Sequence, residues 1–181
     1  MLVCSDRTMS HAELTALADG RAAGLASCGI GRGDLVGLCL PNGCEWVVTY
    51  LALERLQACC VPLNAASAVA EIAHVIRDSG MRALFVSADQ AGALEPYADR
   101  VLLCPDGAVP RARPAPERGS GHAAPVGAAC LAYTSGTTGS PKGSSRRGER
   151  SARVAPTWRG GCASGRRIGW LRRCRWRTRT G

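Results

Sequence analysis

The chain has 181 residues and a formal net charge of +9, from 23 Lys and Arg residues against 14 Asp and Glu residues. The charge is unevenly distributed. Residues 1–143 carry 11 basic and 13 acidic side chains, whereas residues 144–181 carry 12 arginines and one acid, Glu149. This split excludes a domain built around a uniformly basic nucleic-acid-binding groove, and the length suggests one domain, or one and a fraction.

The ten cysteines include no C-x-x-C pair, so their spacing excludes zinc-ribbon and zinc-finger sites. The first residues do not resemble a signal peptide, and no apolar run approaches the roughly 18–20 residues that span a bilayer. We therefore expect a cytoplasmic, reduced protein with buried thiols. The adjacent Cys59 and Cys60 form a conceivable redox pair, but neighbouring residues of a strand point to opposite faces, which favours two separate buried thiols.

The first structural signal is Ser10-His-Ala-Glu13, a capping box that predicts a helix to about Ser27. Its apolar face is predicted to comprise Leu14, Leu17, Ala18, Ala22 and Leu25. Further along the chain, the apolar pattern predicts strands over 35–40, 59–63, 83–87, 101–104 and 128–133, and helices over about 44–57 and 68–79. The segment 105–127, rich in Pro, Gly and Arg, predicts a loop. Apolar strands that alternate with helices predict an α/β fold with a largely parallel sheet and flanking helices.

The regular pattern stops after residue 143. Among Leu, Ile, Val and Phe, residues 144–181 contain only Val154, Ile168 and Leu171. So few apolar side chains cannot offset an ordering entropy of about 1–2 kcal/mol per residue. The sequence therefore predicts a folded part over 1–143 and a disordered, arginine-rich tail over 144–181.

The segment with the clearest chemistry is Thr134-Ser-Gly-Thr-Thr-Gly-Ser-Pro-Lys-Gly143, which directly follows the last predicted strand. Its hydroxyls and backbone N–H groups are donors for anionic oxygens, its glycines permit close backbone approach, and Lys142 adds a point charge that suits a polyphosphate. The carboxyl end of a strand is where open α/β sheets bind ligands. The glycine spacing fits neither a Walker A loop nor a dinucleotide fingerprint.

This segment resembles the phosphate-binding loop of the adenylate-forming (AMP-binding) superfamily, S/T-S-G-S/T-T-G-x-P-K-G, and matches it at every position. The superfamily comprises acyl-CoA synthetases, luciferases and peptide-synthetase adenylation domains. Further family blocks resemble Thr8–Leu14, Gly31–Val36, Leu40–Asn42, Glu45-Trp46, and Val61–Asn64 with Glu71 and Asp78-Ser79. The resemblance runs from about residue 8 to 143, and it looks more like acyl- or aryl-CoA ligases than peptide-synthetase domains.

The resemblance implies the N-terminal part of the adenylate-forming fold, with ATP and Mg²⁺ as the nucleotide complex and CoA as the acceptor. The reaction implied is carboxylate + ATP → acyl-AMP + pyrophosphate, followed by formation of a CoA thioester from the carboxylic acid. It assigns no catalytic or metal-binding residue to this chain. The phosphate ligands that it implies are Thr134, Ser135, Gly136, Thr137, Thr138, Gly139, Lys142 and Gly143.

The sequence departs from the family after Gly143. The family continues with an apolar segment and a histidine-containing helix, whereas this chain continues Ser144-Ser-Arg-Arg, and the later blocks for adenine, ribose and the C-terminal-domain lysine do not follow. The change looks like a reading-frame shift, so we expect a fragment without adenylating activity. An alternative is a non-catalytic binding protein whose arginine-rich tail, with Trp158, Trp170 and Trp176, engages nucleic acid non-specifically or binds anionic lipid.

Overall fold

The computed structural model describes residues 1–4, 7–110, 113–117, 129–134 and 142–146. In chain order its elements are β1 (Leu2–Val3), β2 (Thr8–Met9), α1 (His11–Ser27), β3 (Leu35–Leu38), α2 (Cys44–Leu56), β4 (Cys59–Pro62), α3 (Val69–Ser79), β5 (Ala83–Val86), α4 (Ala88–Leu94), the 3-10 helix η1 (Glu95–Tyr97), β6 (Leu102–Pro105), β7 (Cys130–Thr134) and β8 (Lys142–Arg146).

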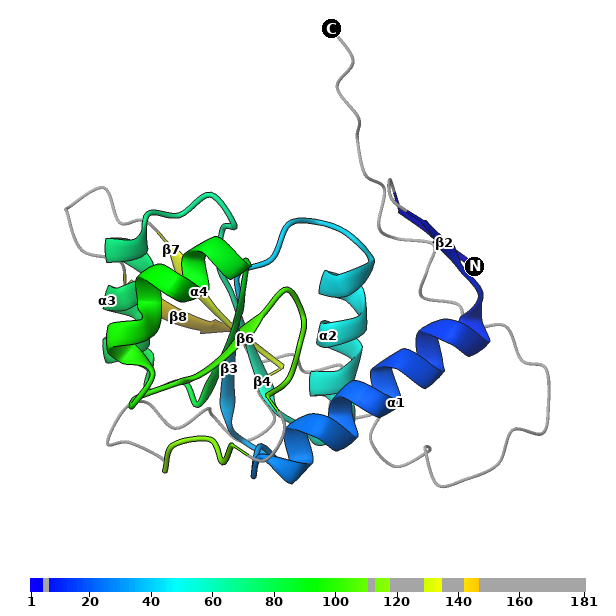
Figure 1. Ribbon diagram of the computed structural model, residues 1–181, viewed down its shortest axis with the longest axis horizontal. Helices are drawn as coiled ribbons and strands as arrows, with labels where there is room; N and C mark the ends of the chain where they lie inside the picture. Colours follow the sequence, from blue (N-terminus) through cyan, green and yellow to red (C-terminus); the bar gives the residue numbers. More distant parts are fainter. Residues whose placement is uncertain (5–6, 111–112, 118–128, 135–141, 147–181) are drawn as a thin grey trace, which may run out of the picture.

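Six of the strands form one sheet in the order β6-β5-β3-β4-β7-β8. The strands from β6 to β7 are parallel, and β8 pairs antiparallel with β7 at the edge. Helices α1 and α2 lie on one face of the sheet, and α3 and α4 lie on the other (Figure 1). The prediction of an α/β fold with a largely parallel, helix-flanked sheet is confirmed.

Helix α1 begins as the sequence predicts. The backbone N–H of Ser10 donates to Oε2 of Glu13 (2.7 Å), and the N–H of Glu13 donates to Oγ of Ser10 (3.2 Å). The predicted apolar face is wrong at Leu17, which is 43% exposed, whereas Ala18, Ala22 and Leu25 are buried. At 3.6 residues per turn Leu17 falls to one side of the stripe formed by those three residues, so it lies at the border of the buried face.

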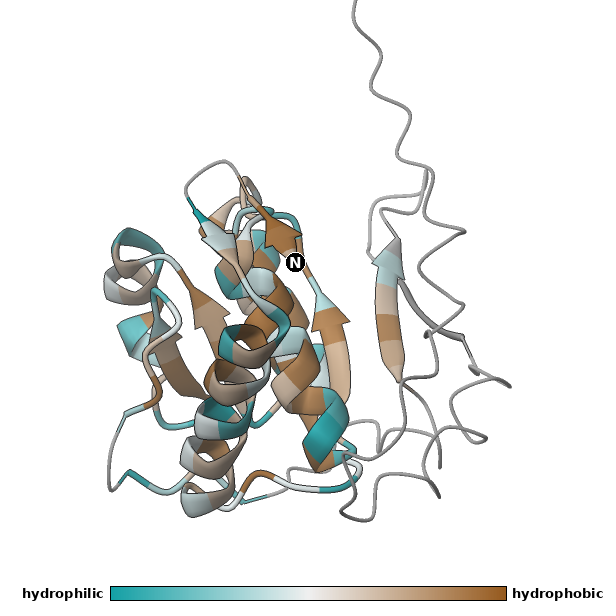
Figure 2. Ribbon diagram, turned by 90° about the vertical axis from the view of Figure 1, so that its right-hand side faces the viewer, coloured by the Kyte–Doolittle hydropathy of each residue, from teal (hydrophilic) through white to brown (hydrophobic). Residues whose placement is uncertain are grey.

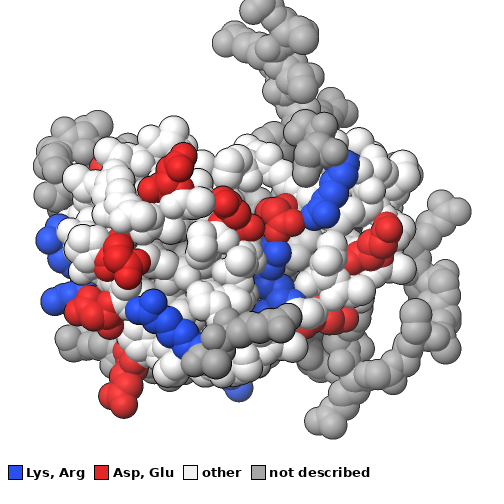
Figure 3. Space-filling model, viewed as in Figure 1, with Lys and Arg blue, Asp and Glu red and all other residues white. Residues whose placement is uncertain are grey.

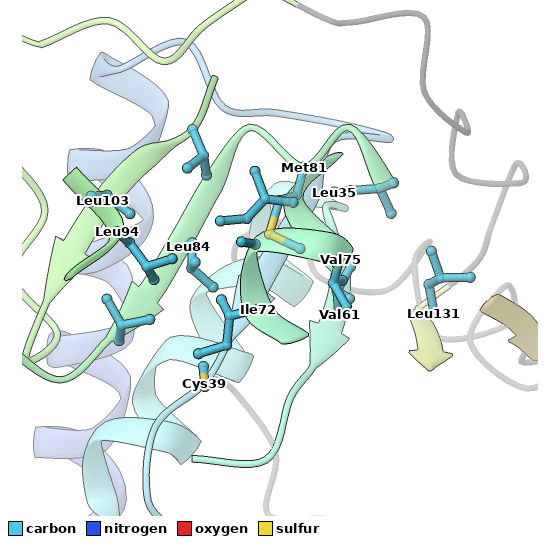
Figure 4. Close-up of a cluster of buried hydrophobic side chains, with 14 of the residues drawn as sticks. Leu35, Cys39, Val61, Ile72, Val75, Met81, Leu84, Leu94, Leu103 and Leu131 are labelled. Atoms are coloured by element: carbon cyan, nitrogen blue, oxygen red, sulfur yellow. The ribbon is translucent and has the colours of Figure 1, made fainter. Parts of the chain in front are cut away.

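Two apolar clusters fill the space on either side of the sheet. On the α3 and α4 side, Ile72, Leu84 and Leu94 come from three different elements and meet between the helices and the sheet (Figure 4). The second cluster includes Leu25 of α1 and Leu53 of α2. In Figure 2 the strands are hydrophobic over most of their length, whereas the helices also carry polar residues. The sheet therefore contributes apolar side chains to both layers, as expected of parallel strands covered on both faces.

The cysteines behave as the sequence predicts within the described residues. Of the eight described, all are free, and six are buried. Cys59 belongs to the cluster on the α3 side and Cys60 to the cluster on the α1 side, because successive residues of β4 alternate between faces. A pairing of these two thiols within the strand is therefore excluded by the fold.

An ion pair connects two strands at the amino edge of the sheet, where the parallel strands begin. Asp34, only 2% exposed, precedes β3, and Arg82 precedes β5. Nη1 of Arg82 donates to Oδ2 of Asp34 and to the carbonyl of Gly29, both at 2.7 Å, and its Nε donates to the carbonyl of Pro116 (2.7 Å). Part of the predicted loop 105–127 is thus fixed against the sheet, and its Ala115 is buried.

The sequence analysis did not predict the two-stranded β1–β2 hairpin, α4, η1 or β8. A second capping box, Ser87-Ala-Asp-Gln90, opens α4 and is readable in the sequence, but the helix is too short to show a periodic apolar face. Strand β8 continues to Arg146, three residues past the expected end of the folded part. Residues 147–181, and with them most of the predicted tail and its tryptophans, lie outside the described residues.

The surface of the described part shows no gathering of charge on the face seen in Figure 3, where acidic and basic side chains alternate. None of the described helices combines the length and the apolar character that crossing a bilayer requires.

Replacement of Arg82 by alanine is expected to lower the free energy of unfolding by about 3–5 kcal/mol, because it leaves the buried Asp34 carboxylate without its ionic partner. Urea denaturation monitored by circular dichroism measures the change. The matched control is Arg55→Ala, which breaks the exposed Arg55–Asp19 pair and is expected to cost at most about 1 kcal/mol. Equal losses in the two variants would contradict a special role for the buried pair.

A second pair of variants tests the packing between β3 and β5. A Cβ atom on Gly37 would lie 2.5 Å from Cδ1 of Leu84 and 2.7 Å from Sδ of Met81, so Gly37→Ala is expected to destabilise the fold by about 1–3 kcal/mol. Gly20→Ala, on the exposed side of α1 with nothing within 4 Å, is expected to stabilise it by about 0.5–1 kcal/mol. Thermal melts of the two variants should therefore shift in opposite directions.

Candidate functional site

The candidate site lies at the carboxyl edge of the sheet, where β7 ends. Because β3, β4, β5, β6 and β7 are parallel, all their carboxyl ends meet at this edge. Thr134, the first residue of the predicted phosphate-binding loop, is the last residue of β7. The loop thus begins at the edge where the sequence predicts it.

Antiparallel pairing with β8 fixes the other end of the loop. In the register of this pair, Thr134 is opposite Lys142 and Tyr133 is opposite Gly143. The backbone of the only lysine in the chain therefore lies directly across from the start of the loop. The loop is the connection of a β-hairpin whose two ends are held one strand spacing apart. The remaining predicted ligands, Ser135, Gly136, Thr137, Thr138 and Gly139, lie outside the described residues.

The loops that follow the neighbouring strands are tied to one another. The thiol of Cys39, after β3, donates to the carbonyl of Asn64 (3.3 Å), after β4. The side-chain amide of Gln90, in α4, donates to the carbonyl of Ala65 (2.9 Å). Oδ1 of Asn64 accepts the N–H of Ala66 (3.0 Å), which closes an Asx turn. These hydrogen bonds connect the segments that follow β3, β4 and β5 to one another, beside β7.

None of these groups is poised as a nucleophile. Burial raises the pKa of Cys39 to about 11, so this thiol stays protonated at neutral pH. Among the described residues, no three His, Cys, Asp or Glu side chains converge in a way that could hold a metal ion. The described groups at this edge therefore offer hydrogen bonding rather than an activated nucleophile.

Tyr133 connects the end of β7 to α3. Its hydroxyl donates to Oδ2 of Asp78 at 2.6 Å, and its ring packs against the cluster that includes Leu131 and Ile76. Burial, and then the Asp78 carboxylate, raise the pKa of Tyr133 above its ordinary value. The sequence did not reveal this contact. Both residues are in or beside the quoted family blocks, but nothing in the chain between them indicates that they meet.

A second charged cluster lies at the start of α2. Glu45 accepts from Arg21 (2.5 Å) and Arg7 (2.8 Å), and Arg21 also donates to the hydroxyl of Thr49 (2.5 Å). Gly107, with φ +82°, passes so close that a Cβ there would lie 2.6 Å from Oε2 of Glu45. The cluster therefore joins α1, α2 and the turn after β6, which is a structural role.

Two open hollows, of about 350 and 430 Å³, run along α1 and are not lined by β7 or β8. Both are lined by Ala16 and Leu17, and each also has one arginine in its lining, Arg7 in the first and Arg21 in the second. Both arginines pair with Glu45, which offsets their charge and makes these hollows weaker candidates for an anion than the predicted loop after β7.

Known proteins are similar to this chain in sequence and in fold. A profile of the family described as AMP-binding enzyme matches residues 1–145. A long-chain-fatty-acid–CoA ligase of Mycobacterium tuberculosis is 33% identical over 165 residues, covering 85% of this chain and 32% of the ligase. A 3-hydroxybenzoate–CoA ligase of Aromatoleum is 32% identical over 157 residues, covering 78% of this chain and 29% of the ligase.

Among solved structures, the o-succinylbenzoate CoA synthetase of Bacillus subtilis in complex with AMP matches with a TM-score of 0.62 and 29% sequence identity, over 79% of this chain and 29% of that chain. The chain thus spans about a third of the length of these relatives. The family match takes in the whole sheet except the last residue of β8 and includes the entire predicted loop. The chain belongs to the AMP-binding enzyme family, and its fold matches part of the N-terminal domain of adenylate-forming enzymes.

Proposed function

We propose that the hairpin loop Thr134–Gly143 binds the β- and γ-phosphates of ATP as part of an acyl-adenylating ligase. The observation that carries this proposal is the register of β7 and β8, which sets Lys142 opposite Thr134 at the carboxyl edge of the sheet. A loop closed in this way brings donors from both strands to one place. The matched relatives, two CoA ligases and a CoA synthetase, support the same function.

The composition of the loop suits a polyphosphate for electrostatic reasons. Its hydroxyls and N–H groups are donors without competing acidic side chains, and the segment between Thr134 and Gly143 contains no Asp or Glu. Lysine is a compact, strongly hydrated charge on a flexible stem, which suits a phosphate that moves as pyrophosphate leaves. Preorganised donors of this kind commonly contribute about 10²–10³ in rate.

The reaction that we propose for the ligase is carboxylate + ATP → acyl-AMP + pyrophosphate, followed by transfer of the acyl group to CoA. The loop holds the leaving pyrophosphate and thereby orients the α-phosphorus toward the carboxylate. Mg²⁺ is usually held by one or two carboxylates together with the substrate phosphates. Beside β7 the Asp78 carboxylate accepts the hydrogen bond from Tyr133, and no three such side chains converge among the described residues, so we assign no residue of this chain to Mg²⁺.

We further propose that these 181 residues bind ATP without completing the reaction. Correct positioning of both reactants contributes roughly 7–11 kcal/mol of barrier reduction. The proposed phosphate site supplies only part of this positioning, and no described side chain beside β7 is placed to orient a carboxylate for in-line attack. Phosphate binding alone therefore gives a site with affinity and without turnover.

Lys142→Ala is expected to weaken ATP and pyrophosphate binding at least about tenfold, since a charge-assisted contact contributes about 1.5–3 kcal/mol. Isothermal titration calorimetry with the full chain measures both ligands. AMP, which lacks the β- and γ-phosphates, is the matched control ligand and should bind the wild type and the variant equally. Binding that Lys142→Ala leaves unchanged and that salt abolishes belongs to the arginine-rich segment. If all ATP binding is of that kind, the loop is not the phosphate site.

The purified chain is expected to show no carboxylate-dependent exchange of pyrophosphate into ATP. The assay uses radiolabelled pyrophosphate with a panel of fatty and aromatic acids, and a complete CoA ligase serves as the positive control. Exchange above background that requires both the acid and Lys142 would contradict the proposal that this chain binds ATP without adenylating.

A further inference from the structure

The contact between Tyr133 and Asp78 places a negative charge where a helix disfavours it. Asp78 is in the last turn of α3, beside the negative end of the helix dipole. The 2.6 Å separation from the Tyr133 hydroxyl is short, as expected of a hydrogen bond to an ionised acceptor. The hydrogen bond from Tyr133 is a favourable contact that this carboxylate makes with β7 despite its place at the end of the helix.

Buried hydrogen bonds hold the backbone next to Asp78. The neighbouring Ser79 is fully buried, donates to the carbonyl of Val75 (2.7 Å) and accepts the N–H of Met81 (3.2 Å). Gly80 then ends the helix in the left-handed conformation, with φ 65°. The backbone next to Asp78 is therefore anchored by buried groups.

Strand β7 pairs with β8 from Cys130 to Thr134, whereas its register with β4 comprises a single residue pair. On the β4 side the pairing register comprises Cys60 with Cys130, at the start of the strand, where the N–H of Cys60 donates to the carbonyl of Ala129 (3.1 Å). Its far end, Tyr133 and Thr134, lies beyond that pairing, and the strand on its other side, β8, is the edge of the sheet. The end of β7 that leads into the loop thus depends on contacts other than β4.

We propose that the hydrogen bond from Tyr133 to Asp78 is a positioning contact for the phosphate-binding loop, which fixes the end of β7 to α3 although Asp78 touches no nucleotide. The inference rests on the proposed binding of ATP phosphates by Thr134–Gly143. A phenylalanine at position 133 would fill the same apolar site, so the hydroxyl has a role beyond packing. The raised pKa of Tyr133 keeps that hydroxyl protonated, and hence a donor, throughout the physiological range.

The test compares Tyr133→Phe, Asp78→Ala and Asp78→Asn in the full chain. Tyr133→Phe and Asp78→Ala are expected to weaken ATP and pyrophosphate binding roughly fivefold and to leave AMP binding unchanged. Asp78→Asn keeps an amide oxygen that accepts the hydrogen bond, so it should bind ATP nearly as the wild type does. The double variant Tyr133→Phe/Asp78→Ala should bind no more weakly than Asp78→Ala alone, because one contact is removed only once.

A second measurement does not depend on nucleotide. In the free protein, amide exchange over residues 130–134 should become faster in Tyr133→Phe, whereas exchange in α1 should not change. The matched control is Tyr97→Phe. Tyr97 packs against the same apolar cluster but lies in η1, outside β7 and α3. This control should alter neither exchange in β7 nor ATP affinity.

The outcomes distinguish the positioning role of the Tyr133–Asp78 contact from the proposed phosphate site. If Lys142→Ala loses ATP binding while Tyr133→Phe keeps it and exchanges normally, the positioning role is overturned and the phosphate site stands. Loss of ATP and AMP affinity to the same extent, or failure of Asp78→Asn to restore ATP binding, also overturns the positioning role. If Lys142→Ala binds ATP as the wild type does, the phosphate site fails and the inference fails with it.

Discussion

The buried ion pair between Asp34 and Arg82 sets the frame for the rest of the sheet. It joins the amino ends of β3 and β5, holds the carbonyl of Gly29 in the turn after α1, and binds the carbonyl of Pro116. A buried ion pair is weak evidence for stability, because desolvation of the two charges offsets much of their attraction. Its effect is to fix the positions of the segments that it joins. One guanidinium group with several fixed acceptors allows only one arrangement of the segments that supply them.

This constraint at one edge governs the geometry at the other. Strands of a parallel sheet are short and stiff, so fixing their amino ends also fixes where their carboxyl ends lie. There the side chains and carbonyls of Cys39, Asn64 and Gln90 tie the following loops together. The β7–β8 hairpin lies beside these connected loops, and the Tyr133 hydroxyl donates a hydrogen bond to Asp78 of α3. The two described ends of the candidate loop are thus mounted on several fixed elements, which is the usual arrangement of binding loops.

The sequence predicted the elements whose signals are local. The Ser10–Glu13 capping box and the apolar strands each depend on a few adjacent residues, and the structure confirms them. The loop was identified by its resemblance to a family, and the edge at which it lies follows from parallel strands. The antiparallel partner β8 and the contact of Tyr133 with Asp78 were not predictable, because they depend on which distant segments the fold brings together. Leu17 was misjudged because a helix face has no sharp border.

The order of strands in the sheet has a consequence for how the chain is made. Strands β3, β4 and β5 and their helices are adjacent in the sequence and can assemble as soon as they are synthesised, but the partner that covers the open side of β4 is β7, which follows β6 and a long connection. Until residue 134 has emerged, β4 presents unpaired N–H and C=O groups beside exposed apolar side chains. Such an edge is a template for pairing with another chain, so the interval before β7 docks is when nascent copies are most exposed to aggregation.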